Sequence, residues 1–399
     1  MQSIQTVSEN AIYVGASDRR LAKFENLFPI PRGVSYNAYV ILDEKTALLD
    51  TADASVGAQF LENVAAALDG RKLDYLIVDH MEPDHAAMIE AVLVRWPDLR
   101  LVVNAKTLPM LKMYYPADSA AFDDALVVKE GDTLDLGKHK LTFVMAPMVH
   151  WPEVMMTFDT TTGTLFSADA FGTFGALEGA LFADEVDFAG KWLDDARRYY
   201  TNIVGKYGVQ VQAVLKKAAG LDIETVCSLH GPILHKEQLA DVLAAYDTWS
   251  AYRPETDGVL VAYTSIYGHT ADAAEQLAEE LRAKGQQVVV MDLARCDMAE
   301  AVAQAFRFSK LVLATPTYNG DVFPFTKTFI EHLTERNYQS RTVALMENGS
   351  WAPTAARVMR KMFEASKNLT ILDEVVTVKG SLDAVSTAQL HALADALSK

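Results

Sequence analysis

The sequence predicts an α/β protein of two domains, in which a layered α/β sandwich precedes a doubly wound parallel sheet. The length of 399 residues is typical of two or three domains. A polar stretch over residues 247–258, which contains Pro254 and Gly258, follows a helical pattern and is typical of a linker. Strand and helix patterns are mixed before this stretch and alternate regularly after it. We therefore expect one domain over residues 1–252 and a second over residues 253–399.

Short apolar runs and amphipathic segments alternate irregularly in the first domain. The apolar runs predict strands at residues 37–42, 46–50, 76–79 and 101–103. Amphipathic segments predict helices at residues 56–68 and 85–96. Hairpin-like strands follow between residues 126 and 168, and helices near 192–218 and 236–246 close the domain. This mixture predicts layers of helix packed on sheet.

The second domain has five apolar runs that alternate with helical patterns. We expect strands at residues 259–264, 287–291, 310–314, 342–346 and 371–378. Helices are expected at residues 270–284, 297–306, 324–335, 354–366 and 382–398. Strict alternation of this kind predicts a five-stranded parallel sheet with helices on both faces.

Composition excludes several classes of protein. The formal net charge of −17 argues against nucleic-acid binding, which needs basic patches. Cys227 and Cys296 lie far apart and form no CxxC pair, so the paired thiolates of a rubredoxin or zinc ribbon are missing. The start has no signal-peptide pattern, and no apolar run approaches the roughly 18 residues that span a bilayer. We expect a soluble, cytoplasmic protein without a membrane partner.

Four metal-binding side chains lie within six positions where an apolar strand ends and a helix begins. They are His80, Glu82, Asp84 and His85. Ligands collect at such strand ends in open α/β architectures. The alternative is structural, with Asp84 capping the helix and His85 lying on its surface.

Three further candidates, His150, Asp169 and His230, also follow short apolar runs and precede turn-forming residues. Each histidine alone is more often structural than a ligand. Together with the first four residues they give four histidines and three carboxylates, which are enough for two metals that share a carboxylate. The histidines at positions 139, 235, 332 and 391 are interpreted as solvated or structural.

Three loops at predicted strand ends in the second domain form another set. The first, Ser265 to Thr270, is rich in hydroxyl groups and opens a helix, so its N–H groups could bind a phosphate. The loops at residues 315–320 and 347–351 each carry an aromatic residue, Tyr318 and Trp351, that could flank a planar ring. The alternatives are an ordinary capped helix and ordinary aromatic packing.

The metal motif resembles the metallo-β-lactamase superfamily, whose hydrolases usually bind zinc and carry His where Glu82 stands. A carboxylate at this position shifts the preference from zinc toward iron or manganese. This variant, the segment 31–39 and the run 150–152 resemble the flavodiiron proteins, also called A-type flavoproteins. The resemblance implies one iron held by His80, Glu82 and His150, and a second held by Asp84, His85 and His230. Asp169 would bridge the two.

The three loops look like those of a flavodoxin, although Tyr267 stands where flavodoxins commonly carry Thr. The similarity implies FMN, with its phosphate on the first loop and its isoalloxazine ring between the other two. The first loop supplies the candidates Ser265, Ile266, Tyr267, Gly268, His269 and Thr270. The other loops supply the candidates Pro316, Thr317, Tyr318, Asn319, Gly320, Asn348, Gly349, Ser350 and Trp351.

The family resemblance covers essentially the whole chain, in the order metal domain and then flavodoxin domain, with no rubredoxin domain. It implies an oxidoreductase that reduces O2 to water, NO to N2O, or both. A flavin carries two electrons and a diferrous pair two more, which together suffice for O2, while the pair alone suffices to couple two NO. A rubredoxin-type electron donor and a head-to-tail homodimer or a tetramer are also implied.

Two other hypotheses remain at this point. One is a metallo-β-lactamase-type hydrolase with a redox-regulatory flavodoxin domain, which Glu82 disfavours. The other is an electron carrier whose first domain is only a scaffold, which the full set of candidate ligands disfavours. Metal identity and variants of Glu82 or His150 distinguish these hypotheses.

Overall fold

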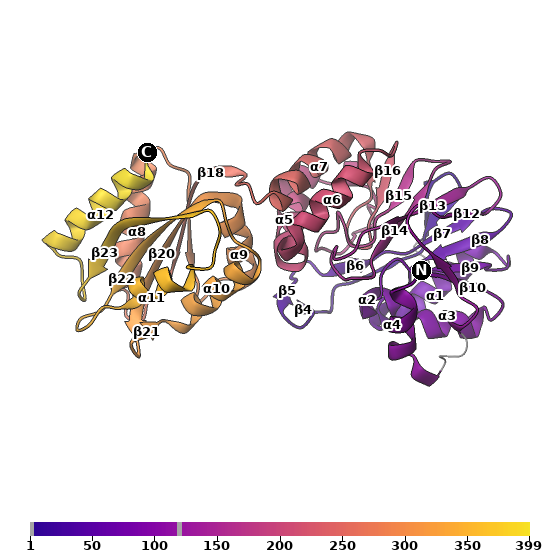
Figure 1. Cartoon of the computed structure of the whole chain (residues 1–399), viewed down its shortest axis with the longest axis horizontal. Helices are drawn as coiled ribbons and strands as arrows, with labels where there is room; N and C mark the ends of the chain where they lie inside the picture. The colour runs from indigo at the N-terminus through magenta and orange to yellow at the C-terminus, as the bar shows by residue number, and fades with distance from the viewer. Residues whose placement is uncertain (1–3, 118–121) are drawn as a thin grey trace. The chain divides into compact units, whose positions relative to one another are not determined.

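The computed structural model describes residues 4–117 and 122–399. The chain folds into two compact units (Figure 1). The first comprises residues 1–200 and 209–247, and the second comprises residues 201–208 and 248–399. The chain therefore passes between the units more than once, and the boundary expected between residues 252 and 253 stays a prediction.

Two sheets packed face to face form the first unit. One sheet has the order β1 (Gln5–Ser8), β2 (Ala11–Tyr13), β7 (Tyr39–Leu42), β8 (Thr46–Leu49), β9 (Tyr75–Ile77), β10 (Arg100–Asn104) and β11 (Leu126–Val128). The other has the order β12 (Thr133–Asp135), β13 (Lys140–Met145), β14 (Met155–Asp159), β15 (Thr164–Phe166), β16 (Thr225–Cys227) and β17 (Leu234–His235). Ile41 and Ile77 of the first sheet share one buried core with Phe143 and Phe166 of the second.

Helices cover the outer faces of these sheets (Figure 1). One sheet carries α1 (Gly57–Leu68), α2 (Pro83–Ala86), α3 (Ile89–Arg95) and α4 (Thr107–Tyr114), and the other carries α5 (Leu193–Tyr199), α6 (Gly208–Ala218) and α7 (Lys236–Ser250). Short strands β3 (Ala16–Asp18), β4 (Lys23–Phe24), β5 (Phe28–Pro29) and β6 (Val34–Tyr36) form two small hairpin-like pairs. This arrangement confirms the predicted layered sandwich of metallo-β-lactamase type.

The second unit is a five-stranded parallel sheet. Its order is β19 (Val288–Asp292), β18 (Thr256–Tyr263), β20 (Phe308–Tyr318), β22 (Arg341–Asn348) and β23 (Leu369–Val378). One core cluster joins the sheet to α8 (His269–Ala283) and α12 (Ala384–Leu397). The other joins it to α9 (Met298–Arg307), α10 (Pro324–Glu335) and α11 (Ala355–Met362). Helices thus cover both faces, which confirms the predicted doubly wound, flavodoxin-like fold.

Two predicted elements differ from the observed ones. The helix expected over residues 85–96 is interrupted between α2 and α3, because the carbonyl of His85 accepts hydrogen bonds from the N–H and Oγ1 of Thr51 instead of continuing the helix. The loop expected at residues 315–320 is partly strand, since β20 runs to Tyr318 and pairs with β21 (Asp321–Val322). Asn319 and Gly320, with φ of 52° and 76°, make the turn between them.

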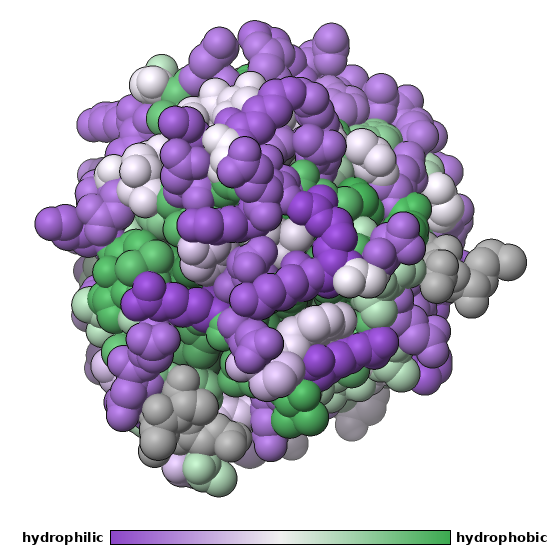
Figure 2. Space-filling model, turned by 90° about the vertical axis from the view of Figure 1, so that its right-hand side faces the viewer, coloured by the Kyte–Doolittle hydropathy of each residue, from purple (hydrophilic) through white to green (hydrophobic). Residues whose placement is uncertain are grey.

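One face of the molecule is mainly polar. Figure 2 shows a face covered mostly by hydrophilic side chains, with smaller hydrophobic patches between them. Among the described residues, no helix combines the length and the apolar character that a membrane span requires.

Candidate metal centre and flavin loops

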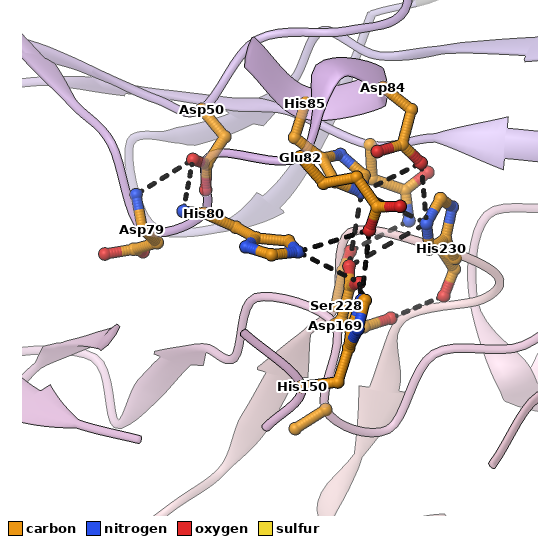
Figure 3. Close-up of polar contacts among 12 residues, drawn as sticks. Asp50, Asp79, His80, Glu82, Asp84, His85, His150, Asp169, Ser228 and His230 are labelled. Carbon is orange, nitrogen blue, oxygen red and sulfur yellow. Dashed lines mark hydrogen bonds and ion pairs between the residues drawn. The ribbon is translucent and has the colours of Figure 1, made fainter. Parts of the chain in front are cut away.

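Two of the first four candidate ligands, His80 and Glu82, lie in the turn that joins β9 to α2, and the other two, Asp84 and His85, lie in α2 itself. Pro83 is the first residue of α2, a position where its fixed φ suits a helix start. The buried carboxylate of Asp50 accepts hydrogen bonds from the backbone N–H groups of Asp79 and His80 at 2.9 and 3.2 Å. These bonds fix the backbone where the strand ends, so that His80, Glu82 and the helix residues point toward the facing sheet (Figure 3).

The other three candidates follow the ends of strands in the facing sheet. His150 follows β13, Asp169 follows β15 and His230 follows β16. Non-glycine residues beside two of them have positive φ, namely 63° at Met148 and 49° at Ala168. Such conformations carry a backbone cost and recur at functional sites. The face-to-face sheets thus bring together side chains that are up to 150 positions apart in the sequence, which is the separation between His80 and His230.

The seven candidates form two adjoining clusters of buried donor atoms. In the first cluster, His150 Nε2 lies 3.0 Å from Glu82 Oε2 and 3.1 Å from Asp169 Oδ2. His80 Nε2 lies 3.4 and 3.5 Å from the same two oxygens. These separations fit ligands that each lie about 2.1 Å from one first-row metal ion.

The second cluster contains Asp84, His85 and His230. The Nε2 atoms of the two histidines lie 3.0 Å apart, and each lies within 3.4 Å of Asp84 Oδ2. Asp169 contacts this cluster too, because its Oδ1 lies 3.2 Å from His85 Nε2 and 3.7 Å from His230 Nε2. The two oxygens of Asp169 therefore face different clusters (Figure 3).

Several donor atoms in these clusters are buried without a hydrogen bond. They are His80 Nε2, both carboxylate oxygens of Asp84 and Asp169 Oδ1. A buried polar atom that lacks a hydrogen-bond partner costs about 1–3 kcal/mol. Coordination to a cation satisfies such atoms, so the residues present fit a pair of metal ions. The assignment of the seven as ligands stays a prediction.

Histidines and carboxylates in the clusters stabilise each other's charged forms. Burial by itself lowers the pKa of His150, but hydrogen bonds to Asp169 and Glu82 raise it to about 9. Burial raises the pKa of Asp169, yet His80 and His85 lower it well below its usual range. The donor set thus contains positive histidines and negative carboxylates, and a bound metal ion would change this charge distribution.

A cavity of about 440 Å³ opens onto the clusters from the solvent side. Phe24 and Tyr36 line it, together with Glu25, Glu82 and Asp84. Burial and the nearby carboxylate of Glu82 raise the pKa of Glu25 to about 7. Small molecules can therefore reach Glu82 and Asp84 through a mouth that is partly aromatic and partly acidic.

Sequence reasoning missed the residues that support the ligands from behind. Glu153 Oε1 lies 2.8 Å from His80 Nδ1, and the backbone carbonyl of Ser35 lies 2.7 Å from His230 Nδ1. Asp50 has the supporting role described above. Glu153 stands three positions after His150, Asp50 ends the strand predicted at residues 46–50, and Ser35 lies in the segment 31–39. These positions do not indicate contacts with the ligands, because such contacts depend on the fold.

The three candidate flavin loops lie at the carboxyl ends of β18, β20 and β22, which are neighbours in the sheet. In the first loop, Ser265 Oγ accepts a hydrogen bond from the N–H of Gly268, whose φ is 100°. Gly268 directly precedes α8, so its loop presents N–H groups at a helix N-terminus. This is the backbone arrangement that binds a phosphate.

Aromatic side chains at these loops are unusually exposed. Tyr267 is 90 % exposed and Trp351 is 82 % exposed, whereas Ile266 and Tyr318 are each 43 % exposed. Large apolar side chains exposed together are typical of a binding surface. The structure thus brings the loops together, and the assignment of their residues to a flavin stays a prediction.

Two predicted flavin-binding residues also have internal roles. Thr317 Oγ1 accepts hydrogen bonds from the N–H groups of Thr354 and Ala355. Asn348 bonds to the backbone of Gly380 and to Thr270 Oγ1. The turn after β23 also borders the first loop, because Ser381 Oγ lies 3.3 Å from His269 Nδ1. Sequence reasoning did not include this turn.

Comparisons with known proteins agree with both halves of the chain. Residues 34–231 match the ODP family beta lactamase, and residues 261–375 match the flavodoxin family. A nitric oxide reductase from Moorella thermoacetica is 29 % identical over 94 % of this chain and 92 % of its own length.

Solved structures share the fold of the whole chain. Rubredoxin oxygen:oxidoreductase from Desulfovibrio gigas superimposes with a TM-score of 0.93 at 25 % identity, covering 99 % of this chain and 98 % of that one. A mutant flavo di-iron protein from Thermotoga maritima gives a TM-score of 0.89 at 25 % identity and covers all of both chains. Both domains therefore occur in these proteins in the order found here.

Proposed function

Because the chain belongs to the flavodiiron proteins, oxidoreductases that join a metallo-β-lactamase-like domain to a flavodoxin domain, we propose that it reduces O2 to water, NO to N2O, or both. Its cofactors are FMN and two iron ions. The relatives named for nitric oxide reduction and for oxygen reduction support both substrates. Electrons would come from an external donor such as rubredoxin and pass through FMN.

The observation that carries the proposal is the position of Asp169 between two donor clusters. Its Oδ2 lies among the donors of His80, Glu82 and His150, and its Oδ1 lies beside the imidazoles of His85 and His230. A carboxylate shared in this way would hold two cations close enough to bind one small substrate. The same arrangement supports His80, Glu82 and His150 as ligands of one ion, and Asp84, His85 and His230 as ligands of the other.

The donor chemistry favours iron or manganese, and the family resemblance favours iron of the two. The first cluster has two carboxylates and two imidazoles, and the second has one carboxylate and two imidazoles beside Asp169. Neither cluster contains a thiolate, and carboxylate donors shift the preference away from soft metals. When bound, two iron ions would supply reversible ferrous–ferric chemistry, and FMN would accept electrons in pairs and release them singly.

The chain's own residues orient and shield this site. Asp50 fixes the backbone that carries His80, and the backbone carbonyl of Ser35 fixes the ring of His230. The donor side chains are at most 11 % exposed, so bulk water is largely excluded from the clusters. Phe24 and Tyr36 give the cavity that leads to them a partly aromatic lining, which a small uncharged gas can pass.

Electron transfer and assembly complete the proposal. A head-to-tail homodimer or a tetramer would place the flavin of one chain beside the metal clusters of another. A cytoplasmic location would give access to a reduced rubredoxin-type donor. Sedimentation of the purified protein checks the assembly, and a strictly monomeric active enzyme would contradict it.

Removal of a ligand tests the function. We expect Glu82→Ala and His150→Ala to lower O2 and NO consumption by at least about 100-fold, because each removes a ligand of the first cluster. Gas consumption by electrode and metal content by elemental analysis are measured on the same samples. Asp159→Asn is the control, since Asp159 is buried beside His139 and belongs to neither cluster.

The outcomes separate the hypotheses. Wild-type protein that holds two zinc ions and consumes neither gas would support the hydrolase hypothesis instead. Full gas reduction by Glu82→Ala would show that the chemistry occurs elsewhere.

A further inference from the structure

The two donor clusters differ in what supports their histidines. His80 Nε2 points at Glu82 and Asp169, whereas Nδ1 at the other side of the ring lies 2.8 Å from Glu153 Oε1. Both side chains of this pair are completely buried. A carboxylate opposite Nδ1 keeps the proton on that nitrogen and leaves the Nε2 lone pair free for a metal.

Glu153 is itself held in place. Its Oε1 also accepts a hydrogen bond from the N–H of Met81 at 2.9 Å, and its backbone carbonyl accepts one from Asn104 Nδ2 at 2.6 Å. Asn104 in turn bonds through Oδ1 to the N–H groups of Lys106 and Thr107 at the start of α4. The carboxylate therefore has little freedom to leave the ring of His80.

Neither histidine of the second cluster has a carboxylate hydrogen-bonded to Nδ1, although the buried carboxylate of Asp50 interacts electrostatically with His85. His230 Nδ1 donates to the neutral backbone carbonyl of Ser35 at 2.7 Å. His85 Nδ1 is buried without a hydrogen-bond partner. Of the four candidate histidines, which all lie in the described part of the chain, His80 is the one whose Nδ1 faces a carboxylate. The two clusters thus differ in the groups that support their histidines as well as in their donor atoms.

We propose that Glu153 is a positioning residue that makes the two irons unequal, with the iron at His80 having the lower reduction potential. A hydrogen-bonded carboxylate makes the imidazole a stronger electron donor, and a nearby negative charge favours Fe³⁺ over Fe²⁺. In the half-oxidised protein, the ferric ion therefore occupies the cluster of His80, Glu82 and His150. The ferrous ion occupies the cluster of Asp84, His85 and His230. This inference rests on the proposed di-iron function.

Two substitutions separate the charge of Glu153 from its geometry. Glu153→Gln keeps an oxygen that can accept from His80 and Met81 but removes the charge, whereas Glu153→Ala removes both. We expect Glu153→Ala to lower the affinity for iron roughly 10–100-fold. Glu153→Gln should retain most of the iron, because the acceptor oxygen remains, and should raise the reduction potential of one of the two irons.

The experiment is a redox titration of the iron-loaded holoenzymes followed by electron paramagnetic resonance, with Mössbauer spectra of ⁵⁷Fe-loaded samples. Asp159→Asn is the matched control, because Asp159 Oδ2 lies 2.8 Å from the Nδ1 of the buried His139, as in the Glu153 pair. It reports the general effect of neutralising a buried carboxylate beside histidine. Thermal unfolding of every variant verifies that it is folded.

A selective rise in one potential for Glu153→Gln, with a changed ferric signal in the half-oxidised state and none in Asp159→Asn, supports the proposal. Wild-type potentials and spectra in a folded, iron-loaded Glu153→Gln overturn it while leaving the proposed function intact. Wild-type protein that binds no iron overturns both.

Discussion

Asp169 is the residue on which the two clusters depend. Its oxygens approach the imidazoles of both, at 3.1 Å from His150 Nε2 and 3.2 Å from His85 Nε2. A substitution at any other ligand leaves one cluster complete, whereas a substitution at Asp169 alters both. The family resemblance implied that Asp169 bridges the two metals, whereas residue type and position along the chain did not by themselves distinguish it from the other candidates.

The raised pKa of His150 predicts a pH dependence of metal binding. The pKa is about 9, so near neutral pH the ring of the metal-free protein holds a proton that a metal ion must displace from Nε2. We therefore expect the affinity for Fe²⁺ to increase as pH rises toward 9 and to level off above it. Anaerobic competition titrations with a chelator of known pH dependence measure the affinity. A pH-independent affinity without proton release would contradict the prediction.

The sequence was sufficient to select the candidate ligands but not the residues that support them. All seven stand after apolar strands, and residue type together with that position was enough to select them. Glu153 and Asp50 were missed, because they act on His80 from positions 73 and 30 residues away. Contacts over such separations follow from sheet pairing and packing, which residue patterns do not specify.

At the scale of elements, both sites lie where strands end. A parallel, doubly wound sheet was expected from alternating strands and helices, but its strand order was not; the observed order brings the three flavin loops side by side. The interruption between α2 and α3 was not expected, because the bonds from Thr51 to His85 come from another strand end. Hydrophobic periodicity describes one helix at a time. It does not indicate that a residue from elsewhere in the fold bonds to a carbonyl of that helix.

The start of α8 gives a prediction about FMN binding. Gly268 has a φ of 100°, and a Cβ there would meet no atom within 4 Å, so an alanine costs backbone energy without a steric clash. A left-handed conformation costs an L-residue about 1–2 kcal/mol, and the turn would relax to avoid it. We expect Gly268→Ala to weaken FMN binding about tenfold, since about 1.4 kcal/mol corresponds to a factor of ten. Flavin fluorescence titration measures this.

Gly285→Ala is the matched control for this prediction. Gly285 follows the other end of α8, has a φ of 84° and has equally open space for a Cβ. Both substitutions therefore carry a similar backbone cost, but only Gly268 belongs to a flavin loop. Equal loss of FMN affinity in the two variants would argue against a phosphate-binding role for residues 265–270.

At the scale of the whole molecule, each domain would hold two of the four electrons that the reduction of O2 needs. In the proposed function, the flavodoxin domain would hold a flavin with two electrons, and the seven clustered donors would hold two irons with two more. The fold class of both domains was predictable from the arrangement of strands and helices. The assembly of the chains, a head-to-tail homodimer or a tetramer, was implied by the family resemblance alone and stays a prediction.

The central claim is that the reduced protein passes these electrons to a gas. The most direct test is stopped-flow oxidation of the anaerobically reduced, iron- and FMN-loaded protein by O2 and by NO in parallel, with product analysis. We expect at least one gas to oxidise both cofactors, with one O2 consumed per chain without peroxide, or N2O formed from NO. Protein that holds iron and FMN yet consumes neither gas, or whose flavin alone reacts and releases peroxide, would contradict it.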